Sequence, residues 1–129
     1  MKYQINKKLH SDFGTFEKNK LAPRAYAIPY ADKEALRAVA PIRERYGSDM
    51  VRVLSGDWDF RFYDSIADVP DRLDSLKVKF KPVTVPSDWQ RLGFEEPVYL
   101  NTTYQIKTLA PELPEDMPVG VYRKIFELD

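Results

Sequence analysis

The amino-acid sequence predicts an all-β domain with one short helix, and three observations support this. Between Asp57 and Phe62 charged and aromatic residues alternate, which is the period of two expected of a half-buried strand. The segment Val119–Leu128 carries apolar residues on both of its faces, as an interior strand does. The chain contains 10 prolines against 5 glycines, which favours many ordered loops over flexible ones.

Composition limits the classes of function that this chain can have. Its 129 residues are within the size of one domain, and 43% of them are hydrophobic, which is enough for a packed core and excludes a disordered chain. Lys plus Arg and Asp plus Glu both number 20, so the net charge is zero. A neutral chain with interspersed charges argues against nucleic acid or an anionic membrane surface as a partner.

The absence of cysteine indicates the cellular compartment. Without cysteine the chain can form neither disulfides nor thiolate metal sites, and a reducing cytoplasm is the default location. The polar residues after Met1 show no signal peptide, and no run approaches the ~20 apolar residues of a membrane span. We therefore expect a cytoplasmic protein that has no membrane partner.

The first part of the chain is predicted to be an extended leader with a short helix. Residues 1–19 show no hydrophobic period, so we expect an arm that is ordered only against a larger body, with His10 exposed. Residues 20–30 contain two prolines and should be extended. Asp32 has the position of an N-cap for a helix of about two turns, and a second weak turn is expected over residues 42–46.

The second part of the chain should consist of strands. The clearest is Met50–Tyr63, with a bulge or a close backbone approach at Gly56. An edge strand guarded by lysines is expected at Ser75–Phe80, and a short strand at Val83–Val85. The two-faced strand Val119–Leu128 is expected in the interior of a sheet.

A long aromatic loop should follow the strand at Val83–Val85. It carries four large rings among the breakers Pro86, Gly93 and Pro97, and these rings are Trp89, Phe94, Tyr99 and Tyr104. So much apolar area is atypical of a surface linker, and so many breakers are atypical of a strand. We therefore predict an ordered loop, pinned by its own aromatics, of the kind on which sites are often built.

Four blocks of the sequence, taken in order, carry a family resemblance. They are residues 20–30 (Lys-Leu-Ala-Pro-Arg-Ala-Tyr-Ala-Ile-Pro-Tyr), 54–63 (Leu-Ser-Gly-Asp-Trp-Asp-Phe-Arg-Phe-Tyr), 85–104 (from Val-Pro-Ser-Asp-Trp-Gln to Tyr-Leu-Asn-Thr-Thr-Tyr) and 118–126 (Pro-Val-Gly-Val-Tyr-Arg-Lys-Ile-Phe). Together they resemble the N-terminal sugar-binding domain of family 2 glycoside hydrolases, in its β-galactosidase branch. Two positions depart from the pattern, with Ser55 and Asp88 where asparagine is expected, and both changes are conservative.

The resemblance implies a galactose-binding-like jelly-roll β-sandwich that this chain contains only in part. It divides the chain into a leader, residues 1–49, and the first part of the sandwich, residues 50–129. The residues alone point the same way, because four to five predicted strands are fewer than the roughly eight of a jelly roll. We therefore expect an N-terminal piece of a β-galactosidase that folds securely only with the remaining polypeptide or by self-association.

The resemblance also implies a reaction and a substrate-binding residue. It implies hydrolysis of terminal β-D-galactosides such as lactose by a retaining mechanism, with both catalytic glutamates outside this chain, and it implies that Asn101 binds the sugar. An amide both donates and accepts hydrogen bonds, which suits a hydroxyl, although from the residues alone Asn101 more simply caps a turn. No catalytic residue, metal ligand or cofactor is expected in this chain. Mg²⁺ and Na⁺ are possible cofactors of the complete enzyme. The partners implied are the β-galactoside, the remaining polypeptide and further copies in a homo-oligomer.

Other interpretations stay open at this stage. The chain could be a stand-alone carbohydrate-binding β-sandwich, or the corresponding domain of a β-glucuronidase or β-mannosidase. Trp58 and Trp89 could stack on a sugar, but we predict that Trp58 is a core residue and that Trp89 pins the loop. Glu95 and Glu96 are adjacent and point apart on an extended chain, so they are not expected to form an acid/base pair. The glycosylation pattern that begins at Asn101 is attributed to chance.

Overall fold

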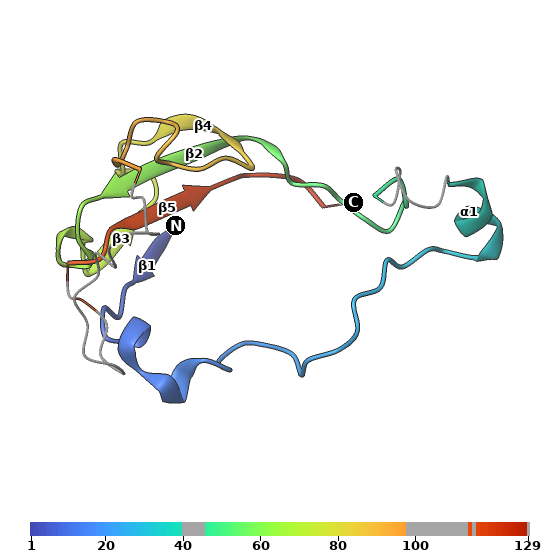
Figure 1. Cartoon of the computed structure of the whole chain (residues 1–129), viewed down its shortest axis with the longest axis horizontal. Helices are drawn as coiled ribbons and strands as arrows, with labels where there is room; N and C mark the ends of the chain where they lie inside the picture. The colour runs from blue at the N-terminus through green and yellow to red at the C-terminus, as the bar shows by residue number, and fades with distance from the viewer. Residues whose placement is uncertain (40–45, 98–113, 115, 129) are drawn as a thin grey trace. The chain divides into compact units, whose positions relative to one another are not determined.

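The fold was analysed in a computed structural model that describes residues 1–39, 46–97, 114 and 116–128. The elements are β1 (Lys2–Gln4), α1 (Lys33–Ala38), β2 (Gly56–Tyr63), β3 (Arg72–Asp74), β4 (Lys81–Val85) and β5 (Val119–Arg123), with single 3-10 turns at Leu9–Ser11, Phe13–Thr15 and Ile66–Asp68 (Figure 1). The strands pair in antiparallel sheets, so the predicted all-β class is confirmed. These sheets contain two and three strands, and the jelly-roll arrangement stays a prediction.

Contacts divide the chain into two compact units. One unit comprises Met1–Lys18 together with Gly56–Asp129, and the other comprises Asn19–Ser55. All five strands belong to the first unit and α1 belongs to the second. The boundary predicted between residues 49 and 50 marks the start of the expected sandwich, and it stays a prediction.

Strand β2 lies at the centre of a three-stranded antiparallel sheet, between β4 and β5 (Figure 1). Its register places Trp58 opposite Val83 of β4 and Phe60 opposite Tyr122 of β5. Because side chains alternate across a strand, Trp58, Phe60 and Phe62 share one face of the sheet. The strand predicted from this alternation is confirmed.

The aromatic face of this sheet is the core of the unit. Phe60 is 1% exposed, and its ring centroid lies 4.6 Å from that of Tyr122, 4.8 Å from that of Phe94 and 6.2 Å from that of Trp89. Burying such a side chain contributes about 2–3 kcal/mol, and each well-oriented ring pair adds about 0.5–1.5 kcal/mol. Two of these rings come from the segment after β4, so that segment is packed onto the sheet.

The opposite, polar face of the sheet is held by Arg123 of β5. Its Nε and Nη2 donate to Asp59 Oδ2 of β2 at 2.9 and 2.6 Å, and its Nη1 donates to the carbonyl oxygen of Ser75. The guanidinium carbon also lies 4.2 Å from the centroid of the Phe80 ring. One side chain thus connects β5, β2 and the segment after β3 through charge-assisted hydrogen bonds and a cation–π contact.

A second sheet joins the start of the chain to residues 72–74. Tyr3 of β1 lies opposite Leu73 of β3, which is 5% exposed, and the Ile5 amide donates to the Asp71 carbonyl at 2.8 Å. The arm expected over residues 1–19 is therefore ordered at its start, against another part of the same chain. No hydrophobic period predicted this strand, because its three residues are all exposed and its bonds are made by the backbone.

The strand predicted over Met50–Tyr63 begins only at Gly56. Gly56 has a φ of +108°, which side chains with a Cβ rarely adopt, so the backbone changes course there and the ladder starts. The special backbone predicted at this glycine is confirmed. The first six residues of the predicted range lie outside the strand, so that part of the prediction is wrong.

The edge strand predicted over Ser75–Phe80 is wrong. The amides of Lys77 and Val78 both donate to the carbonyl of Asp74, at 2.9 and 3.1 Å, and Leu76 N–H donates to the Asp74 carboxylate at 3.1 Å. These bonds fold the segment into a turn directly after β3. An aspartate that accepts bonds from nearby amides competes with ladder pairing, and it outweighed the weak alternation of the sequence.

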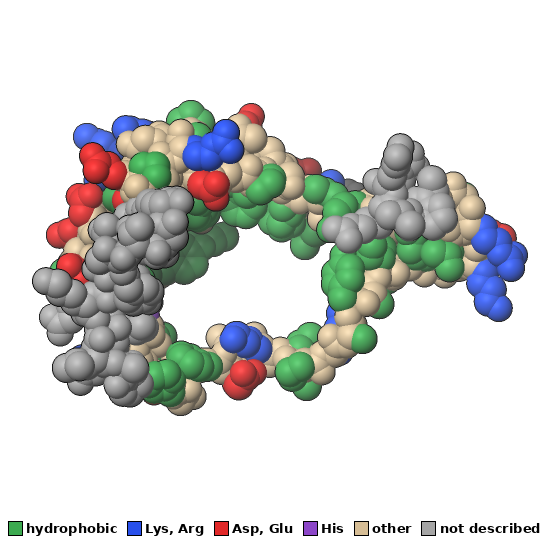
Figure 2. All heavy atoms as spheres, viewed as in Figure 1, with side chains coloured by type: hydrophobic (Ala, Val, Ile, Leu, Met, Phe, Trp, Pro, Cys, Tyr) green, Lys and Arg blue, Asp and Glu red, His purple; other side chains and the backbone are tan. Residues whose placement is uncertain are grey.

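The last strand is shorter and less enclosed than its sequence predicts. Strand β5 ends at Arg123, and within the described residues it pairs with β2 alone, so it lies at the sheet edge rather than in the interior. Tyr122, Ile125 and Phe126 are 41%, 84% and 44% exposed. Figure 2 shows hydrophobic side chains reaching the surface in many places. The apolar pattern of this segment therefore marks a surface that the described residues leave uncovered.

The second unit, Asn19–Ser55, holds the predicted helix. Asp32 accepts a hydrogen bond from the Ala35 amide at 2.7 Å through its side chain, which confirms the predicted N-cap of α1. Ser48 is 5% exposed; its hydroxyl donates to the Pro29 carbonyl at 2.6 Å and accepts from the Met50 amide at 3.1 Å. The weak turn expected over residues 42–46 lies mostly outside the described residues.

Candidate functional site

The candidate site is the loop that follows β4, of which residues 86–97 are described; we call this part the aromatic loop. It begins with a tight turn in which the Arg91 amide donates to the Asp88 carbonyl at 3.1 Å, and the amides of Leu92 and Phe94 both donate to the Trp89 carbonyl at 3.1 Å. The turn closes at Gly93, whose φ of +79° favours glycine. The predicted breakers therefore build an ordered turn.

Trp89 pins the aromatic loop to the sheet. Its ring lies 5.5 Å from that of Phe62 in an edge-on arrangement, in addition to its contact with Phe60. The ring packs over Gly120 of β5, where an added Cβ would lie 2.6 Å from Trp89 Cζ3. The absence of a side chain at residue 120 thus makes room for the tryptophan. The predicted pinning of the loop by its own rings is confirmed for Trp89 and Phe94, which are the described rings of the loop.

Glu95 fixes the loop from within. One of its oxygens, Oε2, accepts hydrogen bonds from Trp89 Nε1 at 2.7 Å and from Gln90 Nε2 at 2.8 Å. A carboxyl oxygen that accepts two such bonds holds the indole in one orientation. The geometry thus assigns Glu95 the role of orienting the Trp89 indole, rather than an acid/base pairing with Glu96.

The two tryptophans are engaged with other side chains rather than free for a sugar. The Trp58 ring stands edge-on to Tyr122 with centroids 6.3 Å apart, and Lys124 Nζ lies 5.7 Å from its centroid. Both Trp58 and Trp89 are half-buried. The prediction that packing outweighs sugar stacking at these two positions agrees with these contacts.

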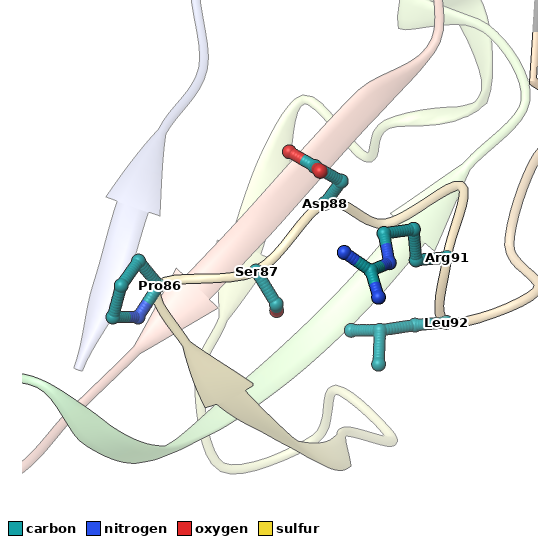
Figure 3. Close-up of a pocket in the computed structure, with 5 residues that line it drawn as sticks. All are labelled: Pro86, Ser87, Asp88, Arg91 and Leu92. Carbon is teal, nitrogen blue, oxygen red and sulfur yellow. The ribbon is translucent and has the colours of Figure 1, made fainter.

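A shallow hollow opens on the outer side of the turn. It has a volume of about 610 Å³ and is lined by Pro86, Ser87, Asp88, Arg91 and Leu92. Figure 3 shows the side chains of Arg91 and Leu92 extending toward Ser87, whereas the Asp88 carboxylate points away from them. The Ser87 hydroxyl donates to the Thr84 carbonyl, and the charged members of the lining are Arg91 and Asp88.

The residue predicted to bind substrate, Asn101, lies outside the described residues, as do Tyr99 and Tyr104. Its role stays a prediction. What the structure shows is the segment that leads to it, anchored by Trp89 and Glu95.

Sequence reasoning missed the specific bonds that anchor this loop. Nothing in the spacing of Trp89, Gln90 and Glu95 identifies a shared carboxylate oxygen. The glycine at residue 120, inside an apolar strand pattern, was a usable signal, because such a glycine often marks a close approach by another group.

No group of three or more His, Asp or Glu side chains in the described ranges could hold a metal ion. No helix among the described residues is both long enough and apolar enough to cross a membrane.

Comparison with known families identifies the domain. The sequence model for "Glycosyl hydrolases family 2, sugar binding domain" matches residues 51–129, which include the three-stranded sheet and the aromatic loop. The chain belongs to glycosyl hydrolase family 2. The resemblance found in the sequence is thereby confirmed at the level of the family.

This family 2 chain is similar to curated proteins that carry the name "Beta-galactosidase". It is 33% identical over 117 residues to a protein named "Beta-galactosidase" from Actinobacillus pleuropneumoniae, covering 91% of this chain and 11% of that protein. It is 32% identical over 125 residues to one of the same name from Staphylococcus xylosus, covering 97% of this chain and 12% of that protein. A third, from Oenococcus oeni, is 35% identical over 80 residues. The chain thus spans about an eighth or less of the length of these relatives.

Proposed function

We propose that this chain is the N-terminal, sugar-binding-domain part of a β-galactosidase that hydrolyses terminal β-D-galactosides such as lactose. The observation that carries the proposal is the combination of a family match over residues 51–129 with relatives that are named β-galactosidases and align with most of the chain. The chain's small share of those relatives supports placing the reaction on polypeptide beyond it. By itself the chain is expected to be inactive.

The proposed reaction needs two carboxyl groups. Retaining glycosidases place a nucleophile and an acid/base about 5–5.5 Å apart. In the described part of the chain Glu95 is committed to Trp89 and Gln90, and the Asp59 carboxylate is committed to Arg123. From the family resemblance, we propose that both catalytic carboxylates lie on the remaining polypeptide, and any Mg²⁺ or Na⁺ site with them.

The contribution proposed for this chain is Asn101. In the complete enzyme its amide would bond a hydroxyl of the bound sugar, at the end of a segment that Trp89 and Glu95 anchor to the sheet. We expect Asn101→Ala to lower kcat/KM by about 10- to 100-fold, the effect of losing one or two substrate hydrogen bonds. The thermal unfolding midpoint should stay unchanged. An unchanged kcat/KM for this variant would remove the residue from the proposal.

The alternative of a stand-alone carbohydrate-binding module is not favoured, because the curated relatives quoted above are named as hydrolases. Isothermal titration of the chain with galactose and lactose separates the two possibilities. A stand-alone module should bind sugar unaided, whereas the proposed part of an enzyme should not. The cytoplasm remains the proposed location, and a homo-oligomer the proposed state of the complete enzyme.

A further inference from the structure

A second hollow lies away from the aromatic loop, and we call it the basic pocket. It has a volume of about 420 Å³, and its walls come from three segments: β2, β3 with Pro70 upstream of it, and the turn after β3. The lining residues are Arg61, Tyr63, Pro70, Arg72, Asp74, Lys77, Val78 and Lys79.

The charges around the basic pocket are unbalanced. Four cationic side chains line it against a single carboxylate, Asp74, in a chain whose total charge is zero. That carboxylate already accepts the Leu76 amide at 3.1 Å. Other cations of the same unit have acidic partners, as Lys7 does with Asp71 at 3.3 Å and Arg123 with Asp59 at 2.6 Å.

Among the described residues, the four cations of the basic pocket have no such partner. No described carboxylate lies within ion-pair distance of Arg61, Arg72, Lys77 or Lys79. Arg61 instead lies with its guanidinium carbon 5.3 Å from the centroid of the Tyr63 ring. Four like charges gathered on one concave surface repel each other, so an anionic partner that binds there relieves the repulsion.

The lining of the basic pocket also contains apolar groups. Tyr63 and Val78 are half-buried, and Pro70 is an exposed member of the same lining. A bare inorganic anion would gain nothing from these groups, whereas an apolar side chain would gain their burial. A lining that combines apolar groups with arginine and tyrosine is typical of protein interfaces.

The basic pocket is independent of the aromatic loop. Arg61 and Tyr63 alternate with Phe60 and Phe62 along β2, so they project from the opposite face of the sheet to the one that Trp89 covers. A partner bound at this pocket would therefore lie on the face of the sheet opposite the one that Trp89 covers.

We propose that the basic pocket binds an acidic peptide segment of a protein partner, in which two or more carboxylates flank an apolar side chain. The two arginines fit carboxylates through paired N–H donors, and the two lysines act as mobile point charges at the rim. Nucleic acid is a poorer fit, because it requires a basic stripe that follows a phosphate backbone, and here the excess is confined to one small hollow.

The test uses the full chain labelled with ¹⁵N and two synthetic peptides. The probe is acetyl-Glu-Glu-Leu-Glu-Glu-amide, and its uncharged counterpart carries glutamine in place of glutamate. We expect the acidic peptide to shift amide signals around Lys77 and Lys79, and the glutamine peptide to bind at least tenfold more weakly. The double change Lys77→Glu with Lys79→Glu should weaken binding at least tenfold. Both side chains are exposed, so the spectrum should otherwise be retained.

The matched control is Lys20→Glu with Lys33→Glu, two exposed lysines of the other unit. Equal loss of binding in this control would overturn the proposal, because it would show attraction to net charge alone. Shifts that occur away from the basic pocket would also overturn it. So would tighter binding of tripolyphosphate or oligothymidine than of the acidic peptide, since that would identify a phosphate site. A change in sedimentation of the peptide-free chain on charge reversal would identify a second copy as the occupant instead.

Discussion

Replacing Gly120 by alanine tests how tightly the aromatic loop is packed on the sheet. The new Cβ would lie 2.6 Å from Trp89 Cζ3 and 2.8 Å from both Trp89 Cε3 and Phe60 Cε2, whereas ordinary contact begins at 3.4 Å. Ring atoms cannot swing aside as the end of a flexible chain does, and Phe60 is already 1% exposed. The loop or the strand must therefore move apart.

The magnitude follows from two opposing effects. Overpacking in a well-packed core costs about 1–3 kcal/mol. Against this, alanine is more favourable than glycine in a strand by about 0.5–1 kcal/mol. We therefore expect Gly120→Ala to lower the free energy of unfolding by about 1–2 kcal/mol. In a Trp89→Leu background the indole is gone and the Phe60 ring can retreat, so the same change should cost at least about 1 kcal/mol less.

The assay is urea unfolding of the four chains of this cycle, followed by far-ultraviolet circular dichroism. Tryptophan fluorescence is unsuitable because one of the two tryptophans is removed. Val121→Ala, on the other face of β5, serves as a control for substitutions in this strand. If Gly120→Ala proves neutral or stabilising with Trp89 present, or costs the same without it, the close approach of the indole to β5 is refuted.

Two further predictions concern the bonds that hold the loop and the polar face. Glu95→Ala should lower the free energy of unfolding by about 1–3 kcal/mol and shift the NMR signal of the Trp89 indole proton, because that proton loses its acceptor. The control Glu96→Ala, at an exposed neighbour, should have neither effect. Equal effects of the two substitutions would contradict the assigned geometry. Arg123→Lys keeps the charge but not the two bonds to Asp59, so we expect urea unfolding to show a free energy of unfolding lower by about 1 kcal/mol. A change below the error of the measurement would show that the positive charge alone suffices.

Local sequence patterns correctly predicted the elements that are determined by residues close together in the sequence. The alternation around Phe60 identified β2 and its buried face, and Asp32 identified the start of α1. The predictions failed where a few backbone bonds decided the outcome. At Ser75–Phe80 the Asp74 turn outweighed alternation, and β1 is a strand only because β3 lies beside it.

The candidate site likewise has features that the sequence could predict and features that it could not. Its place after β4 and its aromatic anchors could be predicted, because breakers and large rings in one short stretch have few other arrangements. The shared oxygen of Glu95 and the space over Gly120 could not be predicted, because both depend on side chains brought together from separate elements. The role of Asn101 rests on family resemblance alone.

The sequence by itself determined the all-β class, the family, and which face of β2 is apolar, since these depend on periodicity and on the order of short motifs. Tertiary structure alone decided that Arg123 links three segments and that four cations gather around one hollow without carboxylate partners in the described part of the chain. The physical reason is the distance along the chain between the residues that interact. Periodicity reports the neighbours of a residue along the chain, whereas pairing across a sheet joins residues such as Asp59 and Arg123, which no local pattern relates.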